Sequence, residues 1–237
     1  MAIAKLFQGL LSDAAIKSAD VPTAALPEDI VINPQRTQRA NTLPTYQKAL
    51  DALGVSEGDE VLDYGAGLGL GADAAALRGA RVSTFEPLPQ GEFKPTYTAP
   101  DDVPAESADK VLNMNVLNVL PREERDKAVL TIGKALRPGG SAIINVRPES
   151  DIKAAKTAIK ADDEGGFIMG TGKERTYQKG FTQKELREYL QQTLGTGFAV
   201  EDVKGLTGPT VKITKMSPVS YDELANTNPF PSTVEDM

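Results

Sequence analysis

The stretch that decides the fold is VLDYGAGLG at residues 61–69, in which an apolar segment runs into glycines at positions 65, 67 and 69. Such a run, followed by a helical pattern, predicts a β-strand, a tight turn and a helix. Glycines let the backbone approach a ligand closely, and the first turn of the next helix presents unpaired N–H groups. The stretch therefore predicts a ligand site, with a tight turn that binds nothing as the alternative.

The glycine turn alone does not identify the ligand. Gly67-x-Gly69-x-x-Ala72 also satisfies the pattern of dinucleotide-binding proteins. Asp63, however, stands two residues before the first glycine, where its charge suits a ligand with an ammonium group and no phosphate. That description fits the methionine end of S-adenosylmethionine. Asp63 and the absence of a Tyr-x-x-x-Lys pair disfavour an NAD(P)-dependent oxidoreductase.

Glu86 ends the next expected strand, 23 positions after Asp63. A carboxylate at the end of the neighbouring strand can accept hydrogen bonds from both ribose hydroxyls of a nucleoside. Both classes of cofactor use such an acid, so Glu86 predicts a nucleoside without choosing between them. An isolated surface glutamate is the alternative.

Outward from this turn, apolar runs alternate with helical patterns, which is typical of β-α-β units and a mostly parallel sheet. Helices are expected at residues 43–53, 70–78, 122–136, 152–161 and 182–194. Strands are expected at residues 60–64, 81–86, 96–98, 110–115, 141–146, 199–203 and 210–214. The last two strands are expected to form an antiparallel pair, because a Gly-Pro turn joins them.

The sequence predicts three regions: an N-terminal extension (1–41), a domain (42–215) and an acidic C-terminal tail (216–237). Glycines separate two short runs at 167–169 and 174–179, which predicts an inserted hairpin near residues 165–180. Thr182 and Glu185 then form a capping-box pattern at the start of a helix. Arg36 and Arg39 precede the first helix, where they could cover a site.

The composition excludes several kinds of chemistry. The chain has no Cys and no His, so it has no disulfide, no cysteine nucleophile and neither of the commonest nitrogen and sulfur metal ligands. No metal site is expected. Acid–base chemistry would fall to Asp, Glu, Lys, Tyr or water.

The net charge of −7 argues against a general coat for nucleic acid. Between Lys127 and Arg187, however, the sequence contains 12 Lys and Arg but only 7 Asp and Glu, which gives a local net charge of +5. This basic segment is interpreted either as a solvated face of the protein or as a surface that binds an anionic substrate. No apolar run is long enough to cross a bilayer, and residues 1–11 resemble an amphipathic helix or a docking segment more than a signal peptide. A cytoplasmic protein is expected.

Four motifs resemble successive motifs of the class I S-adenosylmethionine-dependent methyltransferases: VLDYGAGLG, TFEP, ADKVLNMNVLNVL, and LRPGG running into SAIINV. The resemblance spans roughly residues 43–214. More narrowly, the chain is similar to methyltransferases associated with DNA phosphorothioation, which indicates DNA modification. That similarity rests on DYG at 63–65, VLNV at 116–119, EER at 123–125, TYQK at 176–179 and FTQKEL at 181–186.

The resemblance implies an α/β, Rossmann-like fold with helices on both faces of a seven-stranded, mostly parallel sheet that has an antiparallel terminal strand. It implies S-adenosylmethionine as the cofactor, with Asp63 at its amino-acid end, Glu86 at its ribose, and residues 113–115 beside the transferred methyl group. The cofactor-binding residues that it implies are Asp63, Tyr64, Gly65, Ala66, Gly67, Glu86, Asn113 and Met114.

The methyl acceptor is not identified beyond an N or O atom. The segment Asn113-Met114-Asn115 lacks the (Asp/Asn)-Pro-Pro-(Tyr/Phe) motif of amino-directed DNA methyltransferases, and the missing Cys excludes C5-directed ones. Asn113, Asn115 and Asn118 either cap the strand or orient the acceptor or the cofactor carboxylate.

No catalytic residue is assigned. Four residues are unranked candidates for a general base: Tyr97, Asp101, Asp102 and Lys179. The alternative function is a non-catalytic binding or structural protein that keeps the methyltransferase fold and works with a partner.

Overall fold

The structure is a computed structural model that describes residues 31–38, 42–156 and 158–217. The expected docking segment at residues 1–11, Arg39 and most of the acidic tail lie outside the described residues. None of the helices in the described ranges is long and apolar enough to cross a membrane.

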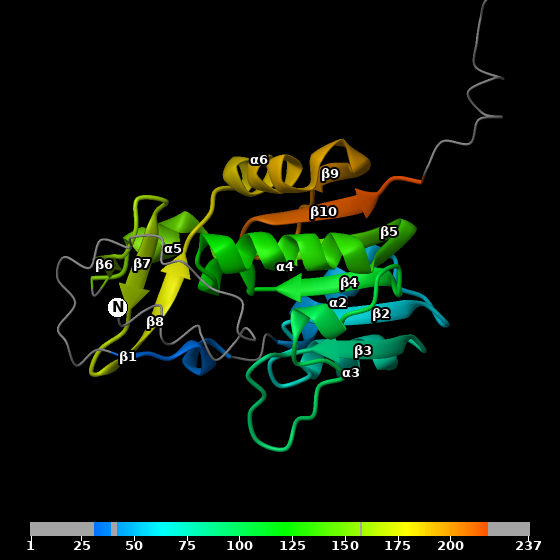
Figure 1. Cartoon of the computed structure of the whole chain (residues 1–237), viewed down its shortest axis with the longest axis horizontal. Coiled ribbons are helices and arrows are strands. Elements are labelled where there is room, and N and C mark those ends of the chain that lie inside the picture. The colour runs from blue at the N-terminus through cyan, green and yellow to red at the C-terminus, as the bar shows by residue number, and fades with distance from the viewer. Residues whose placement is uncertain (1–30, 39–41, 157, 218–237) are drawn as a thin grey trace, which may run out of the picture.

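The centre of the molecule is a six-stranded mixed sheet with the order β3-β2-β4-β5-β10-β9 (Figure 1). Its strands are β2 (Glu60–Tyr64), β3 (Arg81–Phe85), β4 (Ala108–Met114), β5 (Leu136–Asn145), β9 (Phe198–Asp202) and β10 (Thr210–Lys215). The pairs among β3, β2, β4 and β5 are parallel, whereas β10 runs antiparallel to both β5 and β9. The expected mostly parallel sheet with a terminal antiparallel pair is confirmed.

Helices cover both faces of this sheet. On one face, α4 (Arg122–Ala135) and α6 (Gln183–Leu194) pack on the larger core cluster; on the other, α2 (Leu43–Leu53) and α3 (Leu70–Ala76) pack on the smaller one. Neighbouring residues of the central strands face opposite clusters, as Val111 and Leu112 show. Burial on both faces explains why these strands read as continuous apolar runs.

Two helix boundaries follow directly from local sequence. Gly54 ends α2 in the left-handed conformation, with φ of 65°, which a residue without a Cβ adopts at little cost. Thr182 and Glu185 form the predicted capping box of α6: the Thr182 side chain accepts from the Glu185 N–H, and the Glu185 carboxylate accepts from the Thr182 N–H.

The prediction of seven strands is wrong for the described residues, because the segment at 96–98 does not form a strand. Tyr97 makes only an isolated parallel bridge to Phe85: its N–H donates to Thr84 O at 2.9 Å, and its carbonyl accepts from Glu86 N at 3.1 Å. Pro95 and Pro100 flank this bridge, and proline supplies no N–H to a sheet. A short 3-10 helix, η2 (Pro100–Asp102), follows.

The helix expected at 152–161 is also wrong. The segment divides into a short helix, α5 (Glu149–Lys153), and a strand, β6 (Ile159–Lys160). Ile159 pairs with Ile168 of β7 (Gly166–Met169), which pairs in turn with β8 (Glu174–Lys179). Pairing with the predicted hairpin therefore overrides the helical pattern.

The inserted hairpin belongs to a second sheet with the order β1-β8-β7-β6, at the left of Figure 1. Its outer strand, β1 (Val31–Ile32), comes from the N-terminal residues and runs parallel to β8. Ile32, Ile168 and Tyr177 form its buried core together with Ala161. The 3-10 helix η1 (Pro34–Thr37) follows β1, so this small sheet holds the N-terminal segment in place.

Candidate nucleoside-binding site

The glycine turn lies at the carboxyl end of β2, as predicted. The N–H groups of Gly65 and Ala66 both donate to Phe85 O, at 2.8 and 3.0 Å, which joins the turn to the end of β3. Gly65 has a φ of 86° and lies against Val116, so a Cβ at this position would meet the valine side chain. The backbone conformation and the close approach together require glycine here.

Glu86 lies beside this turn and is 5% exposed. Its Oε2 accepts from Gly67 N at 2.9 Å, and its Oε1 accepts from Leu88 N at 3.1 Å. Burial raises the pKa of Glu86, and the hydrogen bonds from Leu88, Gly67 and Gln38 partly offset this rise. Three donors around one carboxylate hold it in a fixed position.

The third donor comes from Gln38, which the sequence did not single out. Its Nε2 donates to Glu86 Oε1 at 2.9 Å and to Leu88 O at 2.8 Å. Gln38 ends η1, the short helix that the second sheet holds next to the glycine turn. Arg36, which was expected to cover the site, instead donates to Glu174 O at 2.7 Å and is exposed.

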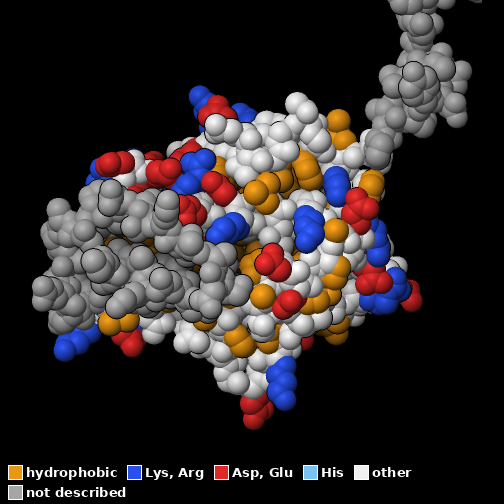
Figure 2. Space-filling view, in the orientation of Figure 1, with side chains coloured by type: hydrophobic (Ala, Val, Ile, Leu, Met, Phe, Trp, Pro, Cys, Tyr) orange, Lys and Arg blue, Asp and Glu red, His pale blue; other side chains and the backbone are white. Residues whose placement is uncertain are grey.

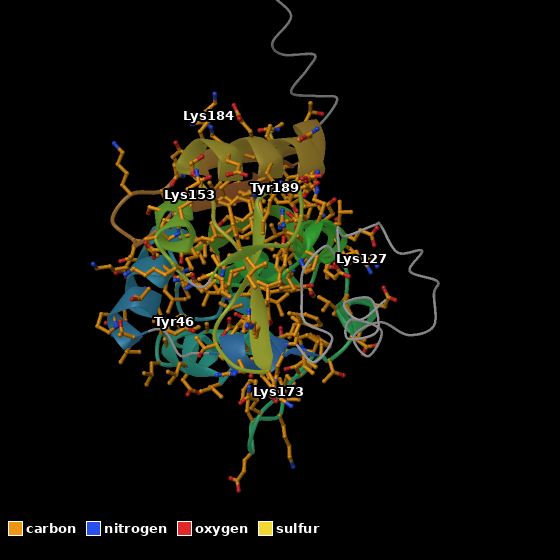
Figure 3. The ribbon with its side chains drawn as sticks, turned by 90° about the vertical axis from the view of Figure 1, so that its left-hand side faces the viewer. Tyr46, Lys127, Lys153, Lys173, Lys184 and Tyr189 are labelled. Carbon is orange, nitrogen blue, oxygen red and sulfur yellow. The ribbon has the colours of Figure 1, made fainter. Side chains whose placement is uncertain are left out.

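A cavity opens between the carboxyl ends of the parallel strands, η1, η3 (Leu117–Val119) and the first half of α4. Tyr46 borders it from α2 and Lys127 from α4; Figure 3 labels both, on opposite sides of the view. Tyr64 and Phe85 lie within its lining with their rings stacked at 4.4 Å. The cavity is thus mostly apolar with few charged groups, as is typical of small-molecule sites.

Six of the eight predicted cofactor-binding residues line this cavity: Tyr64, Gly65, Ala66, Gly67, Glu86 and Met114. Asp63 and Asn113 do not line it, since both side chains are buried next to it. Asn113 Nδ2 donates to Tyr64 O at 3.0 Å, and its Oδ1 has no hydrogen-bond partner.

Asp63 lies beneath the first turn of α3. Its carboxylate is 2% exposed, and burial raises its pKa to about 7, although a hydrogen bond from the Ala72 N–H lowers it and the charge of Glu86 raises it further. Oδ2 of Asp63 has no hydrogen-bond partner. Burial therefore favours the protonated form of this carboxyl far more than at an exposed aspartate.

The polar residues after β4 have separate roles. Asn115 lines the cavity and adopts a left-handed φ of 61°, a conformation that asparagine tolerates better than most residues. Asn118 is buried and donates from Nδ2 to Gln178 Oε1 at 3.3 Å, which joins η3 to β8.

None of the four candidate bases lines the cavity. Asp101 and Asp102 are exposed, and Tyr97 packs against the larger core cluster. Lys179 is buried, where Nζ donates to Glu164 O and to Glu185 Oε1, both at 2.7 Å. Lys179 thus joins β8 to α6. The ionisable residues of α4 that line the cavity are Glu124 and Lys127. The sequence did not indicate them, because the pattern of a helix does not show which of its ends lies beside a cavity.

On the face shown in Figure 2, blue Lys and Arg side chains are interspersed with red Asp and Glu side chains. Several basic residues between positions 127 and 187 are paired with acids, such as Lys153 with Glu149 and Arg187 with Asp202. Within the described residues, no cluster of acidic side chains is arranged to hold a metal ion.

No protein-family model matches the sequence, and no curated protein is significantly similar to it. Solved structures are similar in fold. The Burkholderia thailandensis 1,6-didemethyltoxoflavin-N1-methyltransferase, solved with S-adenosylhomocysteine, is 19% identical with a TM-score of 0.51, over 73% of this chain and 77% of that one.

Two further methyltransferase structures have the same degree of similarity. An S-adenosylmethionine-dependent methyltransferase from Mesorhizobium loti is 18% identical with a TM-score of 0.51, over 73% of this chain and all of that one. CalS10, an amino pentose methyltransferase from Micromonospora echinaspora, is 16% identical with a TM-score of 0.52, over 76% of this chain and 94% of that one. The chain therefore has the fold of the S-adenosylmethionine-dependent methyltransferases.

Proposed function

We propose that this chain is an S-adenosylmethionine-dependent methyltransferase that transfers a methyl group to an N or O atom. The observation that carries the proposal is the joint position of the glycine turn and Glu86. They meet at the carboxyl ends of adjacent parallel strands, beside a mostly apolar cavity. Ligands of open α/β sheets bind at that edge.

The residues present fit the cofactor. Gly65 and Gly67 bring the backbone close to the cavity, and Glu86 keeps acceptor capacity on Oε2, which a ribose hydroxyl needs. Asp63 is a buried carboxylate with an unpaired oxygen near this turn. A ligand ammonium group near Asp63 would favour its ionised form.

When bound, the cofactor supplies a methyl group on a positively charged sulfur, which needs no protonation to leave. The protein therefore has to position the acceptor and exclude water. Tyr46, Tyr64 and Met114 form apolar walls of the cavity that serve both purposes. The helix η1 lines the cavity through Pro34 and Thr37, and Gln38 lines it directly after that helix.

We infer the finer features from the sequence: the acceptor class from the resemblance, and the location and domain bounds from the composition and patterning of the chain. The acceptor is connected with nucleic acid, the protein acts in the cytoplasm, and residues 42–215 form the catalytic domain, with 1–41 and 216–237 as its extension and tail. Transfer of a radiolabelled methyl group into cell extract, followed by digestion with nuclease or protease, tests the acceptor class.

A non-catalytic protein that uses this fold for partner binding is the second candidate. The observation that favours it is the hydrogen bond from Gln38 to Glu86. This bond already uses an acceptor position of the carboxylate that would bind the ribose. Such a protein would bind no cofactor.

Thermal unfolding with S-adenosylmethionine, S-adenosylhomocysteine or NAD distinguishes these functions. A ligand at about 100 times its Kd adds ~2.7 kcal/mol to the free energy of unfolding. A shift with the two sulfur ligands that Asp63→Ala and Glu86→Ala both abolish supports the methyltransferase. No shift with a folded protein favours the partner-binding role, and a shift with NAD alone would contradict both.

A further inference from the structure

The side chain of Gln38 has a defined orientation beside the cavity. Its Nε2 faces two acceptors, Glu86 Oε1 at 2.9 Å and Leu88 O at 2.8 Å. Exchanging the amide nitrogen and oxygen would place oxygen against both acceptors, so the hydrogen bonds fix the assignment. Oε1 of Gln38 therefore points away from Glu86.

Oε1 of Gln38 is buried and has no hydrogen-bond partner, although Gln38 is part of the cavity lining. A buried acceptor without a donor costs free energy, and such groups are rare in folded proteins. Because Gln38 lies in the cavity lining, a ligand bound in the cavity is a source of the missing donor.

The neighbouring carboxylate has room for only one more donor. Oε1 of Glu86 already accepts from Leu88 N and Gln38 Nε2, whereas Oε2 accepts only from Gly67 N. Each carboxylate oxygen accepts about two hydrogen bonds. One hydroxyl of a ribose can therefore bond Glu86, but the second needs another acceptor.

We propose that Gln38 is that acceptor: one hydroxyl of the ribose diol donates to Glu86 Oε2 and the other to Gln38 Oε1. The inference rests on the proposed function, since it concerns the cofactor's nucleoside. It makes residues 31–38 part of the binding site, because the pairing of β1 with β8 and the helix η1 position Gln38. Ribose recognition is then divided between the methyltransferase sheet and the N-terminal segment.

The test measures binding of S-adenosylhomocysteine and its 2′-deoxy and 3′-deoxy analogues by calorimetry. The proteins are the wild type, Gln38→Met and Gln35→Met. Methionine keeps the length of glutamine and removes both polar atoms. Gln35 is the matched control, since it lies in the 3-10 helix that Gln38 caps but is exposed.

Gln38→Met is expected to bind S-adenosylhomocysteine about fivefold more weakly, as for the loss of one neutral hydrogen bond. The wild type should discriminate against both deoxy analogues, and Gln38→Met should lose the discrimination against one of them. Gln35→Met should behave as the wild type. Unfolding midpoints of the ligand-free variants check that both are folded.

Discrimination against both analogues that persists in Gln38→Met would overturn the inference, because Glu86 alone would then read both hydroxyls. An equal loss of affinity for all three ligands would overturn it too, since it would indicate a general effect on the cavity. A wild type that binds no S-adenosylhomocysteine would instead contradict the proposed function itself.

Discussion

The N–H of Gly67 donates a 2.9 Å hydrogen bond to Glu86 Oε2. This bond joins two parts of the site that the sequence places 19 positions apart, one after β2 and the other after β3. Because the strands are parallel neighbours, both residues lie at the same edge of the sheet. The site is therefore held together before any ligand binds, and residue 86 must be able to accept hydrogen bonds from several directions.

Glu86→Gln is expected to weaken binding of S-adenosylhomocysteine by more than tenfold. Glutamine keeps the size of the side chain, but its NH₂ group would face Gly67 N or the donors from Leu88 and Gln38. Opposed donors in a buried site cost about 1–3 kcal/mol. Calorimetry measures the affinity, and Glu92→Gln, at an exposed carboxylate, is the matched control. Unchanged affinity in Glu86→Gln would contradict the assigned role.

Alanine at the two cavity-lining glycines is expected to have different effects. Both have positive φ, which costs alanine about 1–2 kcal/mol. At Gly67 a Cβ meets nothing within 4 Å, whereas at Gly65 it would overlap the side chain of Val116. Gly65→Ala should therefore be the more destabilising by at least ~1 kcal/mol.

Urea unfolding of both variants measures this difference. Val116→Ala removes the side chain that the new Cβ would overlap. This substitution should therefore lower the free energy of unfolding less in the Gly65→Ala background than in the wild type. Equal destabilisation by the two glycine variants would mean that only backbone conformation, and no close approach, requires glycine at position 65.

The sequence was sufficient to predict the parallel core because its strands are buried on both faces. Residues 60–64 form β2 as predicted, since a short apolar run that ends in glycines is compatible with few structures other than a buried strand and a turn. The segments at 96–98 and 152–161 were predicted wrongly for a shared reason. Their structure depends on residues elsewhere in the chain or on flanking prolines. Tyr97, which lies between two prolines, makes an isolated bridge to Phe85, and Ile159 pairs with Ile168.

The candidate site was predictable where a residue type and a strand end coincide. Glu86 and the glycines meet that condition, and they line the cavity. Gln38 does not, because its position depends on the pairing of β1 with β8, which lies about 140 residues further along the chain. Lys179 shows the converse: a charged residue on the predicted insertion is buried in a structural contact with Glu185.

Asp63 is expected to make the stability of the ligand-free protein fall as pH rises. Its pKa is about 7 in the folded state, against 3.8 for an ordinary aspartate, so the folded state binds more protons between these values. The free energy of unfolding therefore decreases through this window, by on the order of 4 kcal/mol as an upper limit, and is constant above it.

Asp63→Asn removes this dependence, so its stability relative to the wild type should increase from pH 4 to pH 8. Urea unfolding at several pH values measures the difference. Asp101→Asn, at an exposed aspartate, controls for the loss of one carboxylate. Parallel pH profiles for Asp63→Asn and the wild type would show that Asp63 titrates normally.

Arg125 is a buried cation without a carboxylate partner among the described residues. It is 1% exposed, its Nη2 donates to Leu120 O at 3.1 Å, and its Nε has no partner. The guanidinium lies 5.3 Å from the ring centroid of Phe181 and 5.6 Å from that of Tyr189. It therefore contributes mainly by filling space between α4, α6 and the segment after β8.

Arg125→Met should thus change the free energy of unfolding by no more than about 1 kcal/mol, because methionine fills the same space without a buried charge. Arg125→Ala should cost about 3 kcal/mol through the cavity it leaves. Arg122→Met is the control, since Arg122 is exposed and pairs with Asp126 at the surface, where such pairs contribute little. If Arg125→Met destabilises the protein as much as Arg125→Ala does, then the charge of Arg125 holds α4 and α6 together, and the packing of its side chain does not.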